Sequence, residues 1–142
     1  MLLERCMLIR QDPFLSQAGF VHRDLRWENV ACIYGTKRWY LLDLEACCVV
    51  DKDPQTFRSV IWDSNTLVGG LYTVASDLHL LGMLINKHCS LLLSEDAISF
   101  LQLLTRPAAE LGTLSADELL RHSWINCSGT TCRDAGADPG EH

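Results

Sequence analysis

The fold of this chain is decided by the stretch His22-Arg23-Asp24-Leu25-Arg26-Trp27-Glu28-Asn29 and by Leu41-Leu42-Asp43, which follows it. Between the two stretches lie two apolar, aromatic-rich runs, residues 30–34 and 38–42, and a turn with Gly35 separates them. Runs of this kind on either side of a glycine turn predict a β-hairpin. The polar loop at His22–Asn29 is therefore expected directly before the hairpin, and Asp43 directly after it.

The rest of the chain predicts helices around this loop and hairpin. Apolar spacing and cap residues predict helices over residues 2–9, 14–18, 76–88, 94–105 and 115–122. The last of these starts with Ser115 and Glu118 in a capping-box pattern. Residues 44–73 lose any clear period and are expected to form a long surface loop. Residues 126–142, rich in Gly, Ser, Thr and Asp, are expected to be a disordered tail.

In this order, the features resemble the C-terminal lobe of a eukaryotic-type protein kinase, over residues 1–125. The anchors of the resemblance are His22–Asn29, which reads H-R-D-L-x-x-x-N, then Asp43, then Ser76–Gly82, which is similar to the family's S-D-x-x-S-L-G. Residues 116–125 look like the last kinase helix. The resemblance implies a mainly α fold with a small β-hairpin, that is, an α+β kinase-like C-lobe.

The resemblance also implies roles for four side chains. Asp24 would orient a substrate hydroxyl and take its proton. Asn29 and Asp43 offer hard oxygen ligands of the kind that suits Mg²⁺. Arg26 would face the transferred phosphate, where kinases commonly carry lysine. ATP and Mg²⁺ are the implied cofactors, and a nucleotide and a protein with a Ser, Thr or Tyr hydroxyl are the implied partners.

Three neighbouring residues have structural alternatives. His22 is expected to pack and hydrogen-bond the loop rather than to act in catalysis. By resemblance Asp77 braces the loop backbone, whereas it could also be a first-turn charge on its helix. Arg23 could form a salt bridge to an acidic neighbour or pair with a phosphorylated residue of the long loop. The candidates for that modification are Thr56, Ser59, Ser64, Thr66, Tyr72 and Thr73.

The chain departs from the kinase pattern in several places. Asp43-Leu44-Glu45 stands where kinases have D-F-G, and the A-P-E element is absent. No Gly-rich loop, strand lysine or partner glutamate precedes His22, so the N-terminal lobe is expected to be absent. Either this chain is a fragment of a longer protein that supplies the lobe, or it does not turn over ATP alone. Arg26-Trp27 and the short activation segment resemble divergent kinase-like proteins of fungi and oomycetes.

A second interpretation of the sequence is a catalytically inactive pseudokinase that acts as an interaction module.

A third interpretation is a small-molecule kinase of the choline- or aminoglycoside-kinase type, but these usually carry H-G-D, and Arg23 replaces that glycine.

The composition of the chain further narrows the classes of partner that it could bind. With 12 basic and 18 acidic side chains the net charge is −6, which disfavours nucleic acid and anionic membranes. No stretch is long enough to span a bilayer, and the N-terminus does not resemble a signal peptide.

The seven cysteines are odd in number and irregular in spacing, which predicts no disulfide framework and a cytoplasmic or nuclear location. His122, Cys127 and Cys132 could in principle ligate zinc, but their spacing matches no recognised ligand pattern. The scattered tryptophans are expected to serve packing.

Overall fold

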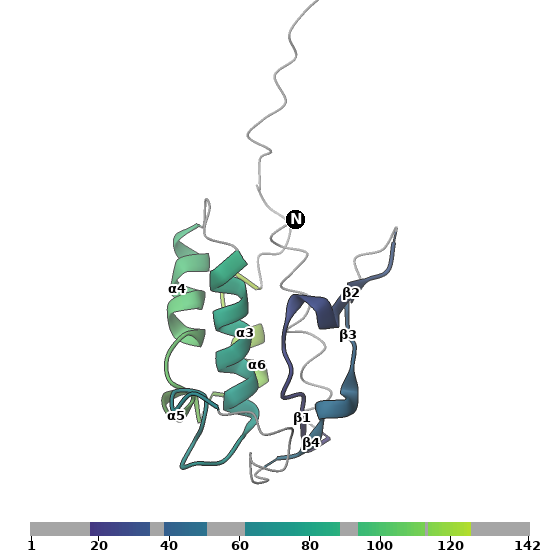
Figure 1. Ribbon diagram of the computed structural model, residues 1–142. Helices are drawn as coiled ribbons and strands as arrows, with labels where there is room; N and C mark the ends of the chain where they lie inside the picture. The colour runs from purple at the N-terminus through teal and green to yellow at the C-terminus, as the bar shows by residue number, and fades with distance from the viewer. Residues whose placement is uncertain (1–17, 35–38, 51–61, 89–93, 113, 126–142) are drawn as a thin grey trace, which may run out of the picture.

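The structure is a computed structural model that describes residues 18–34, 39–50, 62–88, 94–112 and 114–125 (Figure 1). Outside these described residues lie the helix predicted over residues 2–9, all but the last residue of the helix predicted over residues 14–18, the hairpin turn at Gly35 and the predicted tail. Within them the chain combines helices with two small antiparallel sheets, which is an α+β arrangement.

The helices pack together on one side of the molecule (Figure 1). They are α3 (Val74–His88), α4 (Glu95–Leu104), α5 (Ala108–Leu111) and α6 (Ala116–Leu120). The helices predicted over residues 76–88, 94–105 and 115–122 are confirmed, with small differences at their ends. Ser94 caps α4 by accepting a hydrogen bond from the Ala97 N–H at 3.3 Å. The short helix α5 was not predicted.

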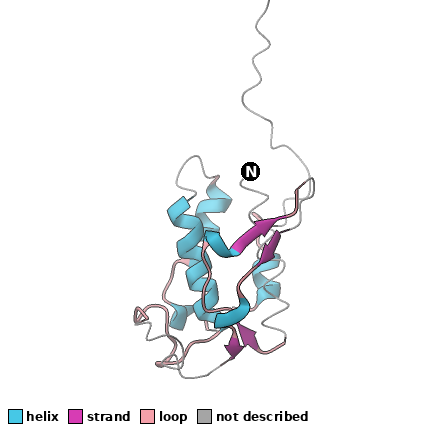
Figure 2. Ribbon diagram, turned by 45° about the vertical axis from the view of Figure 1, so that its right-hand side comes forward, coloured by secondary structure: helices cyan, strands magenta, loops and turns pink. Residues whose placement is uncertain are grey.

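The strands form two separate antiparallel pairs (Figure 2). One pair joins β1 (Phe20–Val21) to β4 (Cys48–Val49), and the other joins β2 (Val30–Cys32) to β3 (Trp39–Leu41). The predicted hairpin is therefore confirmed as β2–β3. The prediction of an unbroken loop over residues 44–73 is wrong at its start. There the 3-10 helix η3 (Leu44–Ala46) leads into β4, whose backbone pairs with β1 from the distant start of the chain.

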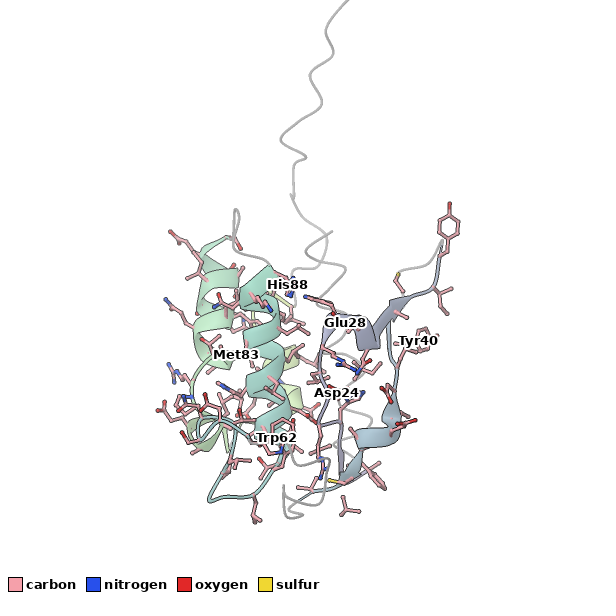
Figure 3. The ribbon with its side chains drawn as sticks, viewed as in Figure 1. Asp24, Glu28, Tyr40, Trp62, Met83 and His88 are labelled. Carbon is pink, nitrogen blue, oxygen red and sulfur yellow. The ribbon has the colours of Figure 1, made fainter. Side chains whose placement is uncertain are left out.

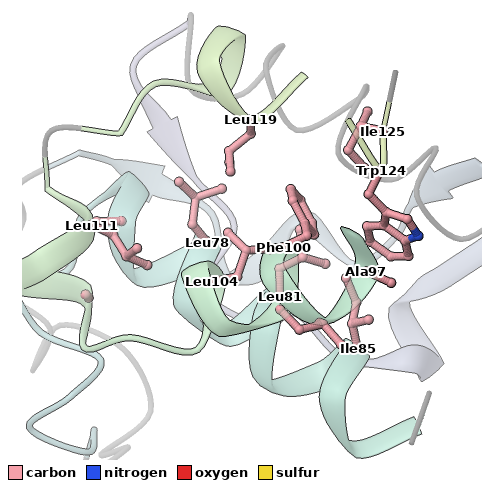
Figure 4. Packing of buried hydrophobic residues seen from close by; sticks show 13 residues of the cluster. Leu78, Leu81, Ile85, Ala97, Phe100, Leu104, Leu111, Leu119, Trp124 and Ile125 are labelled. Atoms are coloured by element: carbon pink, nitrogen blue, oxygen red, sulfur yellow. The ribbon is translucent and has the colours of Figure 1, made fainter. Parts of the chain in front are cut away.

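The hydrophobic core lies between the helices, and Figure 4 shows its packing. Its buried members from α3 include Leu78, Leu81 and Ile85, and α4 contributes Phe100 and Leu104. Helix α3 is not buried on every side, because Met83 is 47% exposed. One side of α3 thus faces the other helices, while its first turn carries the buried Asp77 toward the loop after β1.

Candidate functional site

Asp24 and Asn29 are held together in the loop between β1 and β2. The Asn29 side-chain Nδ2 donates to the Asp24 backbone oxygen and to its carboxylate Oδ2, both at 2.9 Å. The short 3-10 helix η2 (Trp27–Asn29) makes this possible, because it folds Asn29 back so that its N–H donates to the Arg26 oxygen at 3.0 Å. Asn29 is buried, whereas Asp24, which is labelled in Figure 3, remains partly exposed.

Arg26 lies on the exposed side of the same carboxylate. Its Nη2 is 3.3 Å from Asp24 Oδ2, and the side chains of Arg26 and Asp24 are 53% and 30% exposed. An ion pair this exposed contributes about 0–1 kcal/mol to stability, so its importance lies in the position of the guanidinium rather than in the fold. The structure therefore brings the predicted residues Asp24, Arg26 and Asn29 together.

The residue before Asp43 is tied to both ends of the loop. The Leu42 N–H donates to the Asn29 oxygen at 2.8 Å, and His22 Nε2 is 3.0 Å from the Leu42 oxygen. Asp43 follows these two bonds with φ 58° and ψ 69°, and its side chain is exposed. The predicted fourth residue of the site thus directly follows a backbone segment that is fixed against the loop.

His22 has the structural role that the sequence predicted. Because a carbonyl oxygen can only accept, the ring contact with Leu42 requires a hydrogen on Nε2. Nδ1 then accepts the Asp24 N–H at 3.3 Å. The neutral Nε2–H tautomer satisfies both bonds, and the ring is fully buried. His22 therefore holds the loop and the end of β3 together.

Asp77 braces the backbone at the start of the loop, as predicted. Its Oδ2 accepts the His22 N–H at 2.6 Å and its Oδ1 accepts the Arg23 N–H at 3.0 Å. Burial raises the pKa of the Asp77 carboxyl above its ordinary value of 3.8, while the hydrogen bonds from Tyr72, His22 and Arg23 act in the opposite direction. Because it bonds backbone donors far away in the sequence, Asp77 does more than balance the dipole of α3.

Two residues of the motif adopt a left-handed backbone. Among the described residues other than glycine, only Arg23 (φ 69°) and Asp43 (φ 58°) have positive φ. Non-glycine residues in this region cost of order 1–3 kcal/mol and persist where surrounding contacts hold them. Asp43 itself has the left-handed backbone, whereas Glu45, at the position where the resemblance leads one to expect glycine, lies in η3 without positive φ. The turn after Asp43 therefore does not require glycine at position 45.

Arg23 is buried, and its Nη1 lies 3.1 Å from the Cys48 sulfur on β4. Cys48 is a thiol that forms no disulfide. Two of the proposed phosphorylation sites, Thr66 and Tyr72, are buried as well, so neither side chain lies on the surface as that hypothesis requires.

Sequence reasoning missed the role of Tyr72 at this site. Its hydroxyl donates to Asp77 Oδ1 at 2.7 Å, and Trp62 packs on its ring. The available signal was its place just before α3, where a long side chain can reach the first turn of the helix. Position alone does not distinguish this from an exposed loop tyrosine.

Comparisons with protein-family models, with curated proteins and with solved structures found no match for this chain. The interpretation of the site therefore depends on its own geometry. None of the helices in the described part of the chain is both long and apolar enough to cross a membrane. In the same part, no three His, Cys, Asp or Glu side chains form a group that could hold a metal ion.

Proposed function

We propose that this chain is a protein-kinase-like C-lobe that contributes to ATP-dependent phosphorylation of Ser, Thr or Tyr hydroxyls as part of a complete kinase domain. Asp24 would orient the hydroxyl and accept its proton, and Arg26 would face the phosphate. Asn29 and Asp43 would hold Mg²⁺. The observation that carries the proposal is the fixed pairing of Asp24 with Asn29 in the loop that Asp77 braces.

The geometry of Asp24 suits a base that orients a hydroxyl. Its backbone N–H is bonded to His22 and its backbone oxygen to Asn29, so the residue is fixed from both sides. Its carboxylate is nevertheless partly exposed, so a substrate hydroxyl could reach it. A carboxylate that is held in place but accessible is what general-base catalysis requires.

The orientation of Asn29 fits a role as a metal ligand. Because its Nδ2 donates to Asp24, the acceptor Oδ1 is the amide atom that could coordinate a cation. Together with the exposed carboxylate of Asp43, it supplies the hard oxygen donors that Mg²⁺ prefers. When bound, Mg²⁺-ATP would supply the phosphoryl group with its charge partly neutralised.

Thermal unfolding with and without Mg²⁺-ATP tests this proposal. A ligand at about one hundred times its Kd stabilises a protein by roughly 2.7 kcal/mol, which raises the melting temperature by several degrees. We expect Asp43→Asn to lose the Mg²⁺-dependent part of this shift, because asparagine tolerates the left-handed backbone but removes the charge. Asp117→Asn, in the exposed first turn of α6, is the matched control and should retain the shift.

The second candidate function is an inactive interaction module. This function is favoured by the two contacts on one carboxylate oxygen of Asp24. Asn29 Nδ2 donates a hydrogen bond to Asp24 Oδ2, and Arg26 Nη2 forms an ion pair with the same atom. Both contacts occupy a carboxylate oxygen that a substrate hydroxyl would otherwise reach. Absence of any shift in the wild-type protein, with ATP or with Mg²⁺-ATP, would favour this module over the phosphotransferase.

A further inference from the structure

The two oxygens of Asp77 join three segments of the chain. Oδ2 accepts the His22 N–H, and Oδ1 accepts both the Arg23 N–H and the Tyr72 hydroxyl. All four residues are buried. The backbone bonds hold the loop after β1, and the tyrosine bond ties the segment before α3 to the same carboxylate. The direction of the Asp77 carboxylate is thus set from two sides.

Tyr72 is itself held firmly in place. Its side chain is 0% exposed, and the Trp62 ring lies 4.8 Å from its ring, centroid to centroid, at a tilt of 58°. The hydroxyl therefore cannot exchange its bond to Asp77 for water without moving the ring. A donor fixed in this way restricts the rotation of the carboxylate that it bonds.

The backbone of Arg23 depends on that carboxylate. Arg23 has φ 69°, a conformation that residues other than glycine rarely adopt, and its N–H donates to the oxygen that also accepts from Tyr72. Arg23 directly precedes Asp24, so its backbone angles determine where the Asp24 side chain points.

We propose that Tyr72 is a positioning residue, whose hydroxyl orients Asp77 so that Asp77 holds Arg23 left-handed and thereby fixes the direction of Asp24. The catalytic importance of Asp24 rests on the proposed function, whereas the contacts that lead from Tyr72 through Asp77 to Arg23 do not depend on it. Tyr72 would then influence the backbone conformation of the loop after β1 through Asp77, without direct contact with Asp24.

Tyr72→Phe tests this inference through residue-resolved amide hydrogen exchange, because it removes the hydroxyl and keeps the ring. Loss of one buried hydrogen bond should lower the protection of the His22 and Arg23 amides about tenfold. The amide of Phe100 in the helical core should keep its protection. Tyr40→Phe, on the exposed face of β3, is the matched control and should change neither.

A double-mutant cycle separates positioning from packing. If Tyr72 acts through Asp77, Tyr72→Phe should have no further effect on the Arg23 amide in an Asp77→Asn background. The proposal is overturned if Tyr72→Phe leaves the protection of the His22 and Arg23 amides unchanged, or if it lowers their protection and that of Phe100 equally. It is also overturned if the effects of Tyr72→Phe and Asp77→Asn on the Arg23 amide add. Should Asp77→Asn not fold, the loop-to-core comparison in Tyr72→Phe alone decides. Exchange is measured without nucleotide, so a failed Mg²⁺-ATP shift would leave this result standing.

Discussion

Gly82 lies where α3 packs against Leu104, the last residue of α4. A Cβ placed there would be 2.6 Å from the Leu104 Cβ and 2.7 Å from its backbone carbon and oxygen. Backbone atoms in the next helix cannot move aside cheaply, so we expect Gly82→Ala to lower the free energy of unfolding by about 1–3 kcal/mol. Chemical denaturation followed by circular dichroism measures this change.

The matched control for this substitution is Gly112→Ala, at the end of α5. The nearest atom to its added Cβ, the Ala109 oxygen, is 3.5 Å away, and its φ of −58° suits alanine. Gly112→Ala should therefore change the unfolding free energy much less than Gly82→Ala. Equal effects would show that the contact between α3 and α4 is looser than these distances indicate.

At the scale of residues, the sequence predicted the site best where its contacts are local. Asp24, Arg26 and Asn29 are neighbours in the chain, so a short loop with one turn of 3-10 helix suffices to bring them together. The bond from Tyr72 to Asp77 was missed, because it depends on how the segment before α3 packs against Trp62. Tertiary contacts of this kind leave no periodic pattern in the sequence.

The capping box of α6 gives a pH-dependent test at the scale of one element. Hydrogen bonds from the Ser115 backbone and side chain lower the pKa of Glu118 below its ordinary value of 4.5. A pKa lowered by folding means that this carboxylate stabilises the folded state above pH 4.5, and that the stabilisation is lost as the pH falls through the folded pKa. We expect Glu118→Gln to be less stable than wild type at pH 7.

Thermal unfolding across a pH series checks this expectation. The difference between wild type and Glu118→Gln should shrink below pH 4.5 and vanish below the folded pKa of Glu118. Glu110→Gln changes an exposed glutamate of α5 and serves as the control. A Glu118→Gln deficit that stays constant down to low pH would contradict a role of the carboxylate charge in the cap.

The elements that the sequence predicted well carry their own local signals. Ser94 and Ser115 cap their helices by accepting from Ala97 and Glu118, and both helices were predicted from these residues. By contrast, β4 has two residues and exists through its pairing with β1, which lies far away in the chain. The four-residue helix α5 is likewise too short to show a helical period.

At the scale of the whole molecule, α3 connects the core to the candidate site. The same helix buries Leu78, Leu81 and Ile85 in the core (Figure 4) and directs Asp77 to the loop. Packing of the helices therefore determines the position of the Asp77 carboxylate relative to the loop. Loss of the Asp77 carboxylate should also loosen the chain just before α3, because the Tyr72 hydroxyl donates to the same carboxylate.

Asp77→Ala tests this connection. It leaves the N–H groups of His22 and Arg23 and the Tyr72 hydroxyl without their acceptor. Each buried donor left unsatisfied costs about 1–3 kcal/mol, and removal of a carboxylate whose pKa is raised by burial offsets part of the total. We expect a net loss of about 3 kcal/mol by chemical denaturation. A loss no larger than that of Asp117→Ala, an exposed change in α6, would show that the loop holds its shape without the brace.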